Sequence, residues 1–164
     1  MTRFPDMLHQ ALSDLCAELL HGPPEGIAWM LNPGDDGLLR GLDRLTPDEA
    51  SSPAPSGGAP IAAHVDHLRY GFQLLTRWSR GENPFVDADY SASWQITRVT
   101  EEEWAELRRE LGSEAEQWRR VMNTPRDLDE MELKGMISSV AHLAYHVSAI
   151  RQIHRALQGR PAKD

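Results

Sequence analysis

The chain has 164 residues, and its 25 acidic side chains outnumber 17 basic ones, which gives a formal net charge of −8. A chain of this length is expected to fold as one domain, over residues 1–164, with a substantial buried core. Nucleic acids and anionic membranes attract clustered lysine and arginine, and the sequence has no such basic stripe, so neither kind of partner is expected.

The first predicted element is an amphipathic helix over about residues 4–21. Its leucines recur at steps of four and three, which is the spacing of one helical face. Gly22-Pro23-Pro24 follows directly and is expected to end the helix. No part of the chain shows the period-two alternation of a β-strand followed by a hairpin turn.

A long loop is predicted between the first helix and residue 60. The apolar run Ile27–Leu31 could add one turn of helix, and Leu38–Leu45 could form another short piece. Thr46-Pro47-Asp48-Glu49 is a capping box with proline at the first helical position, which predicts a further short helix. The remainder, up to Pro60, is rich in Pro, Ser, Ala and Gly and is expected to be an exposed connection.

Three more long helices are predicted, over about residues 60–80, 100–122 and 129–158. Each carries an apolar stripe at alternating steps of three and four, and the last of them is the most regular. The capping box that begins at Thr100 marks the start of the third long helix. Four such helices predict an all-α protein built as an antiparallel four-helix bundle around one core.

The sequence also predicts a cytoplasmic location. No apolar run resembles a signal peptide or a membrane span of about 18 residues. Cys16 is the only cysteine, so no internal disulfide is possible, and its place in an apolar helical pattern favours a buried, inert thiol.

Five of the seven histidines lie in the helices predicted over 60–80 and 129–158. Two of them, His142 and His146, are four residues apart and therefore project from one helix face. This spacing allows two imidazoles to bind one ion with bonds of about 2.0–2.1 Å. Two exposed histidines on a helix would show the same spacing, so the pair alone does not establish a metal site.

The positions of the histidines relative to the apolar stripes strengthen the metal hypothesis. In heptad notation His64 and His146 occupy g positions and His67 and His142 occupy c positions, so all four lie on the same flank of their helices. If the two helices are neighbours, His64, His67 or both complete a site with the pair. Three imidazoles leave a coordination position open, as in catalytic sites, and imidazole accepts Zn, Ni, Fe or Cu.

The other histidines are given no metal role. His154 occupies a stripe position among apolar residues, and His9 and His21 have no partner at ligand spacing. The alternative for the whole set is that these are solvent-exposed or packed helix-flank residues without a ligand.

The segment from Ala141 to Gln152 resembles the fourth-helix motif H-x-A-Y-H-x-G-x-I-R of the DinB/YfiT-like four-helix-bundle proteins. Pro60-Ile61 followed by His67-Leu68 resembles the second-helix motif of that family, in which a metal-binding histidine precedes a leucine. The resemblance covers most of the chain and its helix order. One departure is Ser148 or Ala149 where many members carry glycine.

The resemblance implies a metal site formed by His67, His142 and His146, with His64 as a nearby extra. It also implies a divalent ion, Zn, Ni or Fe, and a low-molecular-weight thiol as cosubstrate, as in the mycothiol- and bacillithiol-dependent S-transferases of the family. In such an enzyme the metal lowers the pKa of the thiol so that the thiolate attacks an electrophile. A small-molecule substrate, a stress or detoxification role and a homodimer belong to the same set of expectations.

Two other functions stay open at this point. One is a non-catalytic small-ligand or stress-response binding protein with the same bundle, and the other is a metal-free helical interaction module. Tyr70 and Tyr145 could contact a substrate or only pack, and Asp66 could orient an imidazole or lie exposed. Trp29 and Trp94 lie in irregular segments that could cover a pocket or close one end of the bundle.

Overall fold

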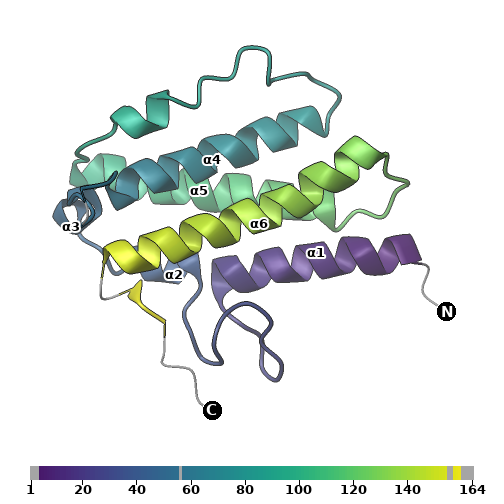
Figure 1. Cartoon of the computed structure of the whole chain (residues 1–164), viewed down its shortest axis with the longest axis horizontal. Coiled ribbons are helices and arrows are strands. Elements are labelled where there is room, and N and C mark those ends of the chain that lie inside the picture. The colour runs from purple at the N-terminus through teal and green to yellow at the C-terminus, as the bar shows by residue number, and fades with distance from the viewer. Residues whose placement is uncertain (1–3, 56, 155–156, 160–164) are drawn as a thin grey trace.

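The computed structural model describes residues 4–55, 57–154 and 157–159, and these residues form helices without any strand. Four long helices lie side by side along the molecule: α1 (Phe4–His21), α4 (Ile61–Trp78), α5 (Glu101–Met122) and α6 (Glu130–Ile153) (Figure 1). The predicted all-α bundle is confirmed, and three of the four helices match their predicted ends within two residues. None of the described helices combines the length and the apolar character needed to span a bilayer.

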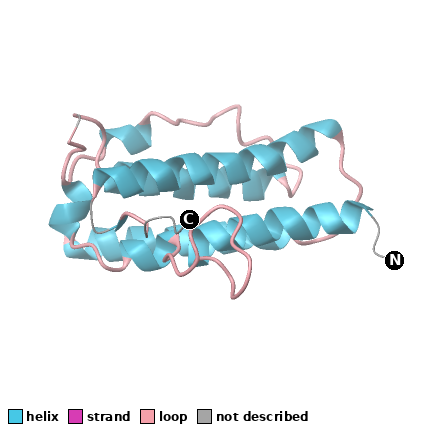
Figure 2. Ribbon diagram, turned by 60° about the horizontal axis from the view of Figure 1, so that its bottom comes forward, coloured by secondary structure: helices cyan, strands magenta, loops and turns pink. Residues whose placement is uncertain are grey.

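The four long helices form a ring in which α1 and α4 each pack against α5 and α6. α4 and α6 run in opposite directions, and so do α1 and α5, whereas α4 and α5 run the same way along the bundle (Figure 1). This arrangement requires a long return, and residues 79–100 carry the chain back along α4 to the start of α5 (Figures 1 and 2). The returning segment includes the short 3₁₀ helix η1 (Ala92–Gln95).

The core lies along the centre of the ring, where each long helix buries its apolar stripe. Trp104 and Trp118 of α5 are among the largest fully buried side chains. Their indole N–H groups donate to the Leu45 carbonyl at 2.9 Å and to Ser139 Oγ of α6 at 2.8 Å. Both rings therefore contribute apolar burial, worth roughly 1.5–3 kcal/mol for a large side chain, without leaving a polar atom unpaired.

The long loop between α1 and α4 contains the two short helices α2 (Leu38–Leu42) and α3 (Pro47–Ser51). Both predicted capping boxes are present, with Thr46 and Glu49 at α3 and with Thr100 and Glu103 at α5. α6 begins with a third box, in which Asp129 accepts from the backbone N–H of Glu132. These caps satisfy backbone donors that have no partner within the helix, and they fix where each helix starts.

The prediction of a helical turn at Ile27–Leu31 is wrong, because these residues are not helical in the structure. Glu18, on α1, is 2% exposed, and its carboxylate accepts backbone N–H bonds from Trp29, Met30 and Leu31 at 2.7–3.1 Å. These donors bind the buried carboxyl group instead of forming a helical turn, and the chain wraps around it.

The prediction that the last helix continues to residue 158 is also wrong. α6 ends at Ile153, and His154 has extended dihedral angles of φ −123° and ψ 123°. Leu157 nevertheless belongs to the core, and its side chain packs beside Gly41, 3.3 Å from the position that a Cβ on this glycine would occupy. Residues 155–156 of the predicted helix lie outside the described residues.

Candidate metal centre

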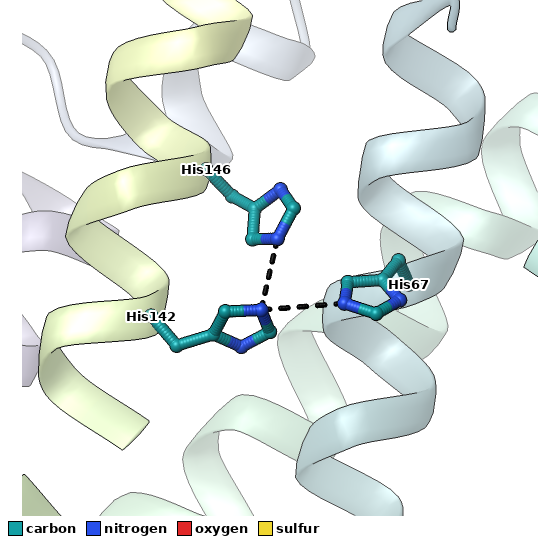
Figure 3. Close-up of side chains that lie close together, drawn as sticks. All are labelled: His67, His142 and His146. Atoms are coloured by element: carbon teal, nitrogen blue, oxygen red, sulfur yellow. Dashed lines mark hydrogen bonds between the residues drawn. The ribbon is translucent and has the colours of Figure 1, made fainter. Parts of the chain in front are cut away.

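Three histidine side chains converge between α4 and α6: His67, His142 and His146 (Figure 3). One ring nitrogen of each lies within 4.8 Å of the others. Nε2 of His142 is 3.3 Å from Nε2 of His67 and 2.9 Å from Nε2 of His146. A tetrahedral ion with bonds of about 2.0–2.1 Å holds its ligands roughly 3.3 Å apart, so these residues could hold one ion between them.

The fold explains this convergence. His142 and His146 are one turn apart on α6, and the neighbouring α4 runs in the opposite direction (Figure 1) and presents His67 to the same space (Figure 3). Both helices are held in register because their apolar stripes are buried in one core. The predicted adjacency of these two helices is therefore observed, and it is the reason the three rings meet.

The cluster is buried on one side and open on the other. The side chains of His67 and His146 are buried, whereas His142 is exposed. Burial lowers the pKa of His146 to about 3, and repulsion by the neighbouring imidazoles adds to this effect. Desolvation between the helices also lowers the pKa of His67 and of His142. All three rings are consequently neutral near pH 7, and each has a lone pair to offer a metal.

A pH dependence of stability follows for the metal-free protein. The pKa of His146 is lower in the folded chain than its ordinary value of 6.5, so the unfolded chain binds more protons at acidic pH. The contribution of neutral His146 to the free energy of unfolding is therefore fully present above about pH 6.5 and is lost as the pH falls towards 3. We expect the urea midpoint of the metal-free protein to fall between pH 7.5 and pH 5.5, and to fall less in His146→Gln. An equal fall in both proteins would contradict this assignment.

Aromatic side chains surround the three histidines. The ring of Trp94, in η1, lies 4.7 Å from the ring of His67 and 6.1 Å from that of His146, measured between centroids. Tyr90 lies 6.0 Å from His67, and Tyr145 lies edge-on to His146 at 5.1 Å. Of the two tryptophans proposed to cover a pocket, Trp94 is the one that covers the cluster.

Hydrogen bonds to α4 hold the segment that carries Trp94. Ser93 Oγ donates to Asp66 Oδ2 at 2.6 Å, and the other oxygen of Asp66 accepts from Arg69 at 2.8 Å. The carboxylate of Asp66 thus positions η1, and the hypothesis that it orients an imidazole is not supported by these contacts. Tyr70 acts on the same segment, because its hydroxyl oxygen accepts from the backbone N–H of Asp89 at 3.1 Å.

The sequence interpretation did not identify Tyr90 or Ser93 as residues near the site. Both lie in the irregular segment between α4 and α5, where no periodic pattern indicates which side chains turn inward. The one available signal was the density of aromatic residues in this loop, which includes Tyr90 and Trp94. Trp29, the other loop tryptophan considered, is 74% exposed on the segment that wraps around Glu18.

The remaining histidines lie outside the three-nitrogen cluster. His64 contacts His146 from the other side, with 2.9 Å between their Nδ1 atoms. His9 is buried and its Nδ1 lies 2.7 Å from the Met122 carbonyl, which joins α1 to the end of α5. His21 pairs with Glu116 at 2.7 Å, and His154 lies 3.5 Å from Glu49.

The single thiol of the chain, that of Cys16, is expected to be unreactive in the folded protein. Cys16 is 1% exposed, and burial raises its pKa to about 12. Because the thiolate is the reactive form, we expect Cys16 in the folded protein to resist alkylation by iodoacetamide at pH 8, and the urea-unfolded chain to react readily. Mass spectrometry of both samples after equal exposure provides the test, and equal labelling would contradict the buried position.

Comparison with known proteins agrees with this architecture. The sequence profile of the DinB superfamily matches residues 1–157, which is nearly the whole chain and includes all three histidines of the cluster. Searches of curated proteins and of solved structures gave no significant match. The helical fold, the three-histidine cluster and the extent of the profile match together show that the chain belongs to the DinB superfamily.

Proposed function

We propose that this protein is a metal-dependent enzyme that transfers a low-molecular-weight thiol to a small electrophilic substrate. His67, His142 and His146 are the proposed ligands of a divalent ion, Zn, Ni or Fe. The observation that carries the proposal is the convergence of three imidazole nitrogens on one point with an exposed side at His142. Three protein ligands leave a coordination position for a substrate, which distinguishes a catalytic site from a structural one.

The residues present fit such an ion. All three donors are nitrogens of neutral imidazoles, which suit Zn, Ni and Fe. When bound, the ion would lower the pKa of a coordinated thiol and so supply a thiolate near neutral pH. The chain contributes no thiol of its own, because Cys16 is buried with a pKa of about 12. The nucleophile is therefore a second substrate in this proposal.

The surroundings of the cluster favour an electrophile with an apolar surface. Trp94, Tyr90 and Tyr145 contact the histidines and remain 38%, 42% and 68% exposed. Exposed aromatic rings around a site provide apolar contact area for a ligand. Trp94 also covers His67 and limits the access of water from that side.

A non-catalytic ligand-binding protein is the second candidate. One observation favours it: in the described part of the chain the ring nitrogens of the three histidines contact only other histidines, and the nearby carboxylate of Asp66 is bound by Ser93 and Arg69 instead. A site of this kind has no carboxylate placed as a general base, although a thiol bound to a metal does not require one. Turnover is what separates the two candidates.

The test uses tag-free protein, so that every histidine belongs to the chain. Wild type, His142→Ala and the control His21→Ala are each assayed without metal and with added Zn, Ni or Fe, in the presence of a low-molecular-weight thiol and an electrophile. We expect metal-dependent thiol consumption in wild type and His21→Ala and its loss in His142→Ala. Bound metal without turnover would favour the binding protein, and equal rates in all three proteins would refute the enzymatic function of this site.

Further expectations accompany this proposal. The substrates are small molecules, the protein acts in the cytoplasm, and a stress or detoxification role suits an enzyme that conjugates thiols to electrophiles. Assembly as a homodimer is a prediction for measurement of the solution mass.

A further inference from the structure

His64 contacts the three-histidine cluster from outside it. It lies on α4, one turn before His67, and its Nδ1 is 2.9 Å from Nδ1 of His146. The other nitrogen of His146, Nε2, faces Nε2 of His142 at 2.9 Å. Because the two nitrogens of an imidazole point in divergent directions, His64 meets the edge of His146 that faces away from the centre of the cluster.

A hydrogen bond at this distance requires that one of the two Nδ1 atoms carries a proton and that the other accepts it. A neutral imidazole that binds a metal through Nε2 must hold its proton on Nδ1. The side chain of His146 is buried, so this N–H has little access to water. Nδ1 of His64 is placed to accept it, and His64 then carries its own proton on Nε2.

Among the residues that the structure describes, the other two histidines of the cluster have no equivalent partner. Nδ1 of His67 is buried and has no hydrogen-bond partner among the described residues. His142 is exposed, so water can reach it. The ring of Trp94 packs edge-to-face against His64 at 5.2 Å with an interplanar angle of 84°, which helps to fix the orientation of the acceptor.

We propose that His64 is a positioning residue, not a metal ligand, which holds His146 in the tautomer that presents Nε2 to the ion. This inference rests on the proposed metal site. Loss of an outer hydrogen-bond partner of a ligating histidine typically lowers metal affinity 10- to 100-fold. His64→Ala should show a loss in that range, because the Nδ1 proton of His146 then has no acceptor.

The test compares His64→Ala with His64→Asn, whose side-chain oxygen can take the place of the lost Nδ1 acceptor. Zinc affinity is measured by competition with a chelator for wild type, both variants and the control His21→Ala, with circular dichroism to confirm folding. Histidine side-chain ¹⁵N NMR of the zinc-loaded proteins reports the tautomer of His146 directly. We expect His64→Asn to recover most of the affinity lost in His64→Ala, and the Nδ1–H signal of His146 to be protected from exchange in every protein except His64→Ala.

The outcomes separate this inference from the proposed site. Unchanged affinity in His64→Ala would overturn the inference alone, provided that wild type binds zinc and His142→Ala does not. Equal defects in His64→Ala and His64→Asn would also overturn it, since packing or direct ligation would then explain the loss. If wild type binds no metal, or if His142→Ala retains it, the metal site itself fails and the role of His64 fails with it.

Discussion

Replacing His67 with alanine should lower zinc affinity by more than the roughly 100-fold upper range seen when an outer partner of a ligand is removed. The reason is geometric, because His67 is the one cluster nitrogen supplied by α4. Without it, two imidazoles one turn apart on α6 must hold the ion against water. Chelator competition on tag-free protein measures the loss.

His21→Ala is the matched control for this prediction. It also removes an imidazole from a long helix, but that ring pairs with Glu116 and lies outside the cluster. We expect wild-type affinity in the control, and both variants should stay folded because the metal is not required to form a core of this size. Comparable affinity in His67→Ala and wild type would show that α4 contributes no ligand.

Gly37→Ala should destabilise the fold by about 3 kcal/mol, the upper part of the usual range for overpacking. A Cβ at Gly37 would lie 2.3 Å from the backbone nitrogen of Gly22 and 2.3 Å from the carbonyl carbon of His21. Both contacts are with backbone at the end of α1, so no side-chain rotation can relieve them. The loop that contains Gly37 would have to move away from the end of α1.

Gly71→Ala, measured in the same experiment, is expected to stabilise the protein. Gly71 lies in the middle of α4, and a Cβ there meets no heavy atom within 4 Å. Alanine at such a position is expected to stabilise the helix by about 0.5–1 kcal/mol. Urea unfolding of both variants and wild type gives the two changes, and an unchanged free energy of unfolding in Gly37→Ala would contradict the close packing.

The long helices were predictable because their signals are local. The stripe of Ile61, Val65, Leu68 and Phe72 identifies the buried face of α4, and the capping box at Thr100 marks the start of α5. The segment Ile27–Leu31 was predicted wrongly because its backbone donors bind Glu18, more than ten residues away in the sequence. No local pattern reports a buried carboxylate that acts at that distance.

The candidate site was predictable in outline for a similar reason. Spacing placed His142 and His146 on one face, and the flank argument placed His64 and His67 towards them. Which of the latter two would join the cluster depends on the relative rotation and shift of two packed helices. In the structure His67 approaches Nε2 of His142, and His64 reaches Nδ1 of His146 instead. The position of Trp94 depends on the Ser93–Asp66 hydrogen bond, which the sequence does not indicate.

The most direct measurement is anomalous X-ray scattering from crystals of tag-free protein that has been supplied with zinc. The proposed site predicts one ion between α4 and α6, bonded at about 2.0–2.1 Å to Nε2 of His67, His142 and His146, with a remaining position open to solvent. An ion bound elsewhere, or no ion between these helices in zinc-supplied crystals, would contradict the account.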